Sequence, residues 1–424
     1  MNPPGGHHSP LELSPGMKCN VVVNFLHRFR FAGVLALVMI NLWPLRPLFG
    51  QPVDERLAVA AKVNGQPVKM AFDTGSDVSV LFRPAAQRLG LSIVEPPAGT
   101  QTAPGQVALA HTAPVQLAFW STNTSTTLFV ANVPAGMTSD IDGVLGWAPL
   151  RNNIFTFDAV NLHMSNSEAV PADALHWITL PIRASSASLV LETPGPAGHP
   201  GVLPVDTGMS EGVALAPAQW RAWRAAHPQA PRTLNAYYMP AAGLVVNEVA
   251  WADDLPLGPL TLHGVPVREA NAIETGNAGP DYVGTLGIYV FKRTNLVLDG
   301  KGGEAYFQPL TTAAPEFQHN RLGAVFTPRD MNSDPMMATV LPGTPAAAAG
   351  LQTGDVLLKI DDLDVTKWRT TPGILPLSRF WQKPAGTKLT LTLKRGDKEF
   401  QAAVTLRDLI GPHVSASAAP AAKN

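Results

Sequence analysis

The sequence is poor in cysteine, in charge and in close groups of metal-binding residues. Its 424 residues contain one cysteine, and only 15% are charged, with 31 basic and 32 acidic side chains. A single cysteine excludes a disulfide framework, and a net charge of −1 gives no overall attraction to nucleic acid or to an anionic membrane. The histidines show no close ligand pairing, and there is no Gly-x-Ser-x-Gly motif or phosphate-binding glycine loop. We therefore expect no metal and no cofactor.

The apolar segment near the N-terminus is short. Arg28 and Arg30 precede an apolar run from Phe31 to Ile40, and about ten residues are too few to cross a membrane comfortably. A basic stretch followed by a short apolar run is typical of an export signal. We expect residues 1–50 to be a signal peptide or, if uncleaved, an inner-membrane anchor. The protein would then be exported to the periplasm or cell envelope of a bacterium, and its only cysteine, Cys19, would lie in the targeting segment.

Proline and glycine are abundant. The chain has 40 prolines and 36 glycines, while 46% of its residues are hydrophobic. Both residue types interrupt helices and mark turns, which favours many short strands. The length is enough for two or three domains, each with its own core. The composition therefore predicts a folded, mainly β protein.

Two parts of the chain repeat the same order of features. Each has a strand, a turn and a second strand that ends in Asp-Thr-Gly, and each continues to an apolar segment that ends in Leu-Gly. This repetition predicts two lobes of similar plan, at residues 52–175 and 176–312. The matched features in the first and second copies are segments 57–75 and 189–208, the Asp-Thr-Gly turns at 73–75 and 206–208, the glycines Gly146 and Gly287, and the strand-end aspartates Asp158 and Asp299, for which we expect a structural role.

The repeated Asp-Thr-Gly motif indicates a particular chemistry. Asp73 and Asp206 each follow an apolar strand. Two carboxyl groups that face each other across a two-fold axis share a proton, because both cannot be charged at once. One can then act as a general base on water while the protonated one polarises a carbonyl group. The hydroxyls of Thr74 and Thr207 can bond across to the opposite turn.

The segments FDTGSDVSVL (72–81) and VDTGMSEGVAL (205–215), each followed by a Leu-Gly segment, resemble the two halves of pepsin-type and retroviral-type aspartic proteases. The resemblance implies a bilobal pepsin/retropepsin-like β fold with a cleft between the lobes, and polypeptide substrates. It also implies a catalytic Asp73 and Asp206, supported by Thr74, Gly75, Ser76, Thr207 and Gly208.

Parts of the sequence depart from this pattern. Met209 follows the second motif where the family usually has Ser, Thr or Ala, so we expect Asp206 to lack the hydroxyl donor that Ser76 can give Asp73, and Asp73 to have the lower pKa. Asp77 adds a third carboxylate near the pair. Candidates for a substrate flap are Pro97–Gln106 and Ala236–Gly243, where Tyr237 and Tyr238 could cover a substrate or could equally be ordinary packing residues.

The run VLPGTPAAAAGLQTGDVLLKIDD (340–362) resembles the centre of PDZ domains appended to bacterial envelope proteases. The resemblance implies a small α+β domain over residues 321–410, followed by a disordered tail at 411–424. PDZ domains bind an extended chain end and hold its carboxylate on backbone N–H groups. The candidate loop is Leu322, Gly323, Ala324, Val325 and Phe326, although a packing or oligomerisation module without a ligand remains open.

Together these features predict an exported aspartic endopeptidase whose PDZ domain recognises peptides or chain ends and presents substrates. The alternative is a catalytically inactive envelope protein that binds peptides through the cleft and the PDZ domain.

Overall fold

The computed structural model describes most of the chain after residue 56. Among these residues, none of the helices combines the length and apolar character needed to span a membrane. The expected signal or anchor and most of the expected tail lie outside the described residues, as does nearly all of the first flap candidate. The described ranges are 57–97, 109–133, 140–161, 163–195, 199–239, 243–330, 332–371 and 373–412.

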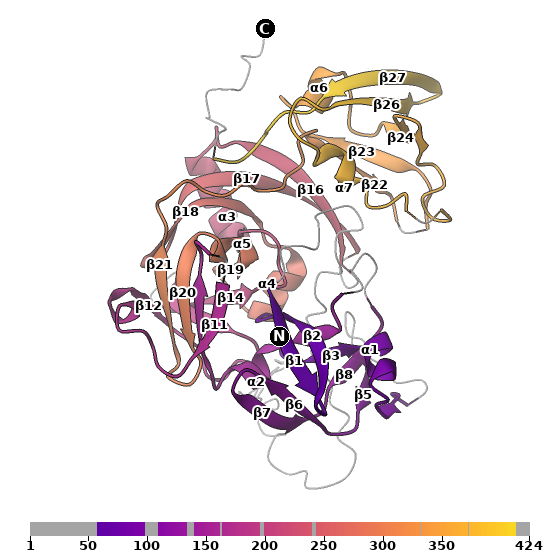
Figure 1. Cartoon of the computed structure of the whole chain (residues 1–424). Coiled ribbons are helices and arrows are strands. Elements are labelled where there is room, and N and C mark those ends of the chain that lie inside the picture. Colours follow the sequence, from indigo (N-terminus) through magenta and orange to yellow (C-terminus); the bar gives the residue numbers. More distant parts are fainter. Residues whose placement is uncertain are drawn as a thin grey trace, which may run out of the picture. The chain divides into compact units, whose positions relative to one another are not determined.

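A nine-stranded sheet forms the first half of the protein (Figure 1, indigo to purple). Its strands β1 and β2 form a hairpin through Asn64 and Gly65, which both have positive φ angles of 49° and 81°. An Asn-Gly pair suits such a tight turn. β1 alternates exposed and buried side chains, so one face covers a core. In sheet order the strands are β4 (Ile93–Val94), β5 (Ala110–Thr112), β8 (Phe129–Ala131), β3 (Val80–Phe82), β9 (Gly143–Leu145), β2 (Gln66–Phe72), β1 (Ala58–Val63), β6 (Val115–Phe119) and β7 (Thr122–Thr126).

A seven-stranded sheet repeats this plan in the second half. In the first sheet β9 pairs in parallel with β2 and antiparallel with β3. In the second, β19 pairs in parallel with β14 and antiparallel with β15. The repetition seen in the sequence is thus a repetition of strand pairing. In sheet order the strands are β13 (Val190–Pro194), β14 (Pro200–Asp206), β19 (Gly284–Gly287), β15 (Val213–Leu215), β18 (Leu260–Glu269), β17 (Gly243–Leu257) and β16 (Arg232–Met239).

A five-stranded sheet takes strands from both halves. β10 of the first half pairs with β20 of the second, so the two copies are joined through backbone hydrogen bonds. Asp158 and Asp299 end these two strands and accept backbone N–H groups of the following turns, from Val160, Asn161 and Gly302. These contacts fit a structural role for both aspartates. In sheet order the strands are β11 (His163–Ser167), β10 (Ile154–Asp158), β20 (Thr294–Asp299), β21 (Glu304–Pro309) and β12 (Ile178–Pro181).

Short helices connect these strands, and one hydrophobic core extends through both halves. α3 packs Trp220 and Trp223 into that core. The helices are α1 (Arg83–Arg88), α2 (Trp147–Leu150), the 3₁₀ helix η2 (Ala174–His176), α3 (Pro217–Ala226), α4 (Ala272–Ala278) and α5 (Ile288–Phe291).

The C-terminal domain has a separate core and its own sheet (Figure 1, orange to yellow). Asp355 is buried and forms a two-pronged ion pair with Arg395, which ties the start of β24 to the end of β26. The fold as a whole is mainly β. The elements are β22 (Ala324–Pro328), β23 (Met336–Val340), α6 (Pro345–Ala348), β24 (Val356–Ile360), β25 (Leu363–Asp364), α7 (Ser378–Trp381), β26 (Lys388–Arg395) and β27 (Lys398–Thr405).

Candidate active site

The two Asp-Thr-Gly turns occupy the same position in their lobes. Asp73 directly follows β2, and Asp206 is the last residue of β14. Each of these strands pairs in parallel with the Leu-Gly segment of its own lobe, Phe72 with Leu145 and Asp206 with Gly287. The apolar Leu-Gly segments therefore fix the strand ends that carry the carboxyl groups.

The structure brings the turns together through their threonines. Thr74 Oγ1 donates to the carbonyl of Val205 at 2.6 Å, and Thr207 Oγ1 donates to the carbonyl of Phe72 at 2.7 Å. The Thr207 hydroxyl also accepts the backbone N–H of Thr74 at 3.0 Å, and the Thr74 hydroxyl accepts that of Thr207 at 3.2 Å. Both threonines are almost fully buried. Four reciprocal hydrogen bonds thus hold the two lobes in register at the aspartates.

Gly75 allows the close approach of the two turns. A Cβ atom at this position would lie 2.6 Å from Cγ of Asp206, which is inside any real contact distance. Only glycine fits here without moving the opposite carboxyl group. The carboxyl group of Asp206 therefore faces the first turn directly.

The two carboxyl groups are held differently. Asp73 accepts the backbone N–H groups of Gly75 and Ser76 at 3.0 and 3.2 Å. Asp206 accepts that of Gly208 at 2.8 Å. Burial raises the pKa of Asp206 well above its usual value, and the nearby charge and hydrogen bond of Asp73 raise it further. This arrangement favours an ionised Asp73 beside a protonated Asp206.

The residues after each motif also differ. The Ser76 hydroxyl donates its proton to the carbonyl of Val78 at 2.8 Å, so the expectation of a hydroxyl donor to Asp73 is wrong, and the donor is the Ser76 backbone N–H. Met209 is buried, and its Sδ accepts a hydrogen bond from Arg268 at 3.2 Å. Met209 therefore supplies no hydroxyl to Asp206, and its side chain contacts Arg268 instead.

Asp77 lies close enough to the pair to interact with it. Burial raises its pKa to about 6, and the charge of Asp73 adds to that increase. Its Oδ1 atom is buried without a hydrogen-bond partner in the part of the chain that the structure describes. A third carboxyl group is thus placed where its ionisation is unfavourable.

A buried ionic network lies behind Asp206 in the second lobe. Arg268 is 2% exposed and binds both carboxylate oxygens of Glu274 at 2.6 and 2.9 Å. Its Nε lies 3.9 Å from Glu211, and Asn271 caps α4 in a reciprocal capping box with Glu274. Sequence reasoning missed this network. Its signal was an arginine within an apolar strand, followed by the Asn-x-x-Glu capping pattern at 271–274.

The candidate flap residues lie on the hairpin of β16 and β17. Tyr237 is 4% exposed, and its Oη accepts hydrogen bonds from Asn247 and Asn271. The Arg268 guanidinium lies 5.8 Å from the centre of the Tyr237 ring. Tyr237 therefore packs into the ionic network, whereas the side chain of Tyr238 lies outside the described residues. The flap assignment stays a prediction.

The candidate peptide-binding loop is at the edge of the C-terminal sheet. Leu322, Ala324, Val325 and Phe326 are each at most 3% exposed.

Within the described ranges, no three His, Cys, Asp or Glu side chains gather closely enough to hold a metal ion.

Two family models match segments of this chain. A family model of aspartyl proteases matches residues 59–148, which include the first Asp-Thr-Gly turn, and a PDZ domain model matches residues 337–395. No curated protein matches the chain.

Solved structures that match part of this chain include basic 7S globulin from soybean, at 12% identity and a TM-score of 0.35, covering 62% of this chain and 93% of the globulin. They also include the EIAV protease in complex with the inhibitor HBY-793, at 24% identity and a TM-score of 0.18, covering 23% of this chain and 86% of that protease. The matched segments thus give an aspartyl-protease-like region at residues 59–148, which carries the first Asp-Thr-Gly turn, and a PDZ domain at residues 337–395.

Proposed function

We propose that the protein is an aspartic endopeptidase that hydrolyses peptide bonds with a water molecule activated between Asp73 and Asp206. The observation that supports this most directly is the pair of carboxyl groups on turns locked together by Thr74 and Thr207. An ionised and a protonated carboxyl group are both required for the reaction, and their environments favour that division.

The chemistry follows from the two protonation states. Asp73 takes a proton from water as the water oxygen bonds to the peptide carbonyl carbon, and Asp206 gives its proton to the carbonyl oxygen. When the intermediate collapses, the proton on Asp73 passes to the leaving nitrogen, the C–N bond breaks, and Asp206 recovers its proton from the hydroxyl. Both carboxyl groups end in their starting states.

Asparagine substitutions test this proposal. Asp73→Asn and Asp206→Asn preserve shape but remove the base and the acid, so each should lower kcat/KM on unfolded casein by about 10²- to 10⁴-fold. The matched control is Asp299→Asn, which keeps the oxygen that accepts from Gly302 and should retain full activity. Assays across pH 3–8 should show a bell-shaped profile for the wild type.

The same assays separate the proposal from its alternative, a catalytically inactive peptide-binding protein. If the wild type and both variants are equally inert over the whole pH range, the endopeptidase proposal fails. If the variants keep wild-type activity, the hydrolysis comes from other residues or from a contaminant.

A further inference from the structure

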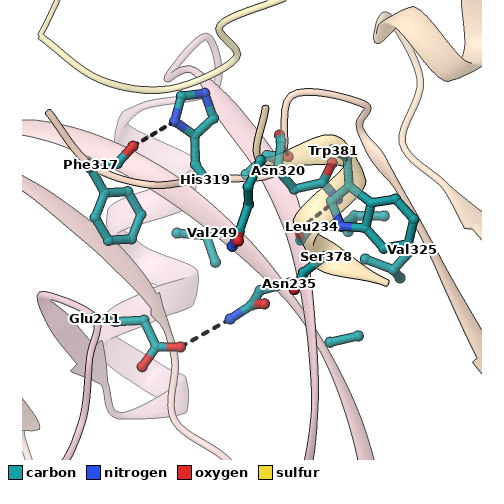
Figure 2. A pocket seen from close by; sticks show the side chains of 13 residues that line it. Glu211, Leu234, Asn235, Val249, Phe317, His319, Asn320, Val325, Ser378 and Trp381 are labelled. Carbon is teal, nitrogen blue, oxygen red and sulfur yellow. Dashed lines mark hydrogen bonds between the residues drawn. The ribbon is translucent and has the colours of Figure 1, made fainter. Parts of the chain in front are cut away.

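The peptide-binding edge of the PDZ domain is already covered by the chain itself. β22 is the edge strand of the domain's sheet, and PDZ domains bind an extended peptide at such an edge. Edge strands ordinarily leave one side open. Here Val325 of β22 and Trp381 of α7 line a cavity together with Leu234 and Ala236 of β16, which belongs to the second lobe (Figure 2).

The contact between β16 and the domain is apolar and close. Leu234 and Ala236 are 6% and 2% exposed and belong to the hydrophobic core of the C-terminal domain, not to that of their own lobe. The cavity left beside them is about 20 Å³, which is room for one water molecule. A peptide and β16 cannot occupy this groove together.

Asn320 links the groove to β16 through polar contacts. Its Oδ1 accepts the backbone N–H groups of Leu322 and Gly323 at 2.9 and 3.1 Å, so the donors that a chain-end carboxylate would need are already engaged. Its Nδ2 donates to the carbonyls of Leu234 and Ala324 at 3.1 and 2.8 Å. Thr233 Oγ1 donates to the carbonyl of Asn320 at 2.6 Å.

Two side chains on the opposite face of β16 contact the ionic network of the second lobe. Asn235 donates to Glu211 at 3.0 Å (Figure 2), and Tyr237 packs against Arg268. Successive residues of a strand point to opposite faces. Leu234 and Ala236 therefore contact the groove, whereas Asn235 and Tyr237 contact the ionic network behind Asp206.

We infer that the PDZ groove is an internal binding site for β16, and that an extended peptide with a free carboxylate binds only by displacing this strand. The domain thus acts as a clamp on the β16–β17 hairpin. A further consequence, which rests on the proposed endopeptidase function, is that displacement of β16 disturbs the Asn235 and Tyr237 contacts and lowers catalysis at Asp206.

A binding experiment on the whole chain tests the clamp without any need for activity. The probe is a fluorescein-labelled peptide of residues 231–239 (PRTLNAYYM) with a free carboxylate, followed by fluorescence anisotropy. In the wild type an intramolecular strand competes with the probe. Leu234→Glu, which places a charge at the apolar contact, should bind the probe at least about tenfold more tightly than the wild type.

Two further variants control this result. Thr233→Val removes only the 2.6 Å hydrogen bond to Asn320 and retains the shape of the strand, so it should fold normally and bind the probe a few-fold more tightly than the wild type. Val246→Glu places the same charge on the partner strand, opposite Ala236, at a side chain that is 38% exposed. It should bind the probe like the wild type.

The inference is overturned if the wild type, Thr233→Val and Leu234→Glu bind the probe equally, including the case in which none binds. It is also overturned if Val246→Glu gains as much affinity as Leu234→Glu. Casein hydrolysis by the wild type is read separately: an inert wild type that shows the expected series of probe affinities would refute the proposed function and leave the clamp intact.

Discussion

The residues on the strands next to the two Asp-Thr-Gly turns differ far more than the turns themselves do. In the first lobe Val80 pairs with Val144 and Phe129, and these residues form a small apolar cluster. In the second lobe the equivalent position is Ala214, which pairs with Thr285 and Arg268. An arginine therefore occupies the place that phenylalanine has in the first lobe.

This difference explains how two turns with nearly the same backbone arrangement carry carboxyl groups that differ in protonation. The threonine hydrogen bonds are reciprocal, so the backbone geometry is nearly the same on both sides. The charge of Glu274 adds to the effect of burial and of Asp73 in raising the pKa of Asp206. The residues behind the second turn, together with the backbone N–H donors of each turn, therefore help to determine which carboxyl group is protonated.

The largest effect should come from breaking the buried ion pair of the second lobe. Arg268→Met leaves the buried Glu211 and the partly buried Glu274 without their cation, which should cost about 3 kcal/mol in the free energy of unfolding. Denaturant unfolding measures this loss. The control is Arg183→Met, because Arg183 and Glu192 form a partly exposed pair that should contribute about 0–1 kcal/mol.

A double variant sharpens the same test. Combining Arg268→Met with Glu274→Gln removes one uncompensated charge. The double variant should therefore lose less free energy of unfolding than the sum of the losses in the two single variants. Equal costs for Arg268→Met and Arg183→Met would show that the charged layer is not a structural element of the second lobe.

The next effect concerns the residue that follows each motif. Met209→Ser removes the buried sulfur that accepts from Arg268, and its shorter polar side chain reduces the burial on this side of the second turn. Burial is the largest cause of the raised pKa of Asp206, and about 1.4 kcal/mol corresponds to one pH unit. The alkaline limb of the pH–rate profile should therefore move by about one pH unit toward lower pH, because ionised Asp206 is less disfavoured.

The matched control for this change is Met337→Ser, at a side chain 40% exposed in the C-terminal domain. Its profile should coincide with that of the wild type. An unmoved alkaline limb in Met209→Ser would contradict the view that this position contributes to the difference between the two acids.

The paired turns were predictable from the sequence because their signals are local and repeated. The motifs at Asp73 and Asp206, the Leu-Gly segments and the mainly β fold all follow from turn residues and apolar strands that recur in the same order. The Pro-Gly and Ala-Gly-Leu string likewise predicted the PDZ domain, which the family match bears out.

The contacts of β16 were not predictable in this way. Nothing local in residues 234–237 shows that alternate side chains contact the C-terminal domain and the ionic network of the second lobe, because that depends on residues far away in the sequence. The role of Arg268 was also hidden, since its partners Glu211, Glu274 and Met209 come from three separate elements.

The smallest effect should come from Asp77, the extra carboxyl group of the first lobe. The second lobe has Ser210 at the same motif position. Burial raises the folded-state pKa of Asp77 to about 6, so its favourable contribution to stability is complete below pH 3.8 and is lost as the pH rises through 6. Asp77→Asn removes this penalty. It should raise the Tm at pH 7.5 by about 2–4 °C, equivalent to about 1 kcal/mol after allowance for solvent screening, and leave the Tm at pH 3.5 nearly unchanged. Thermal unfolding at both pH values measures the difference, with Asp299→Asn as the control. An equal change in Tm at both pH values would show that ionisation of Asp77 is not the cause.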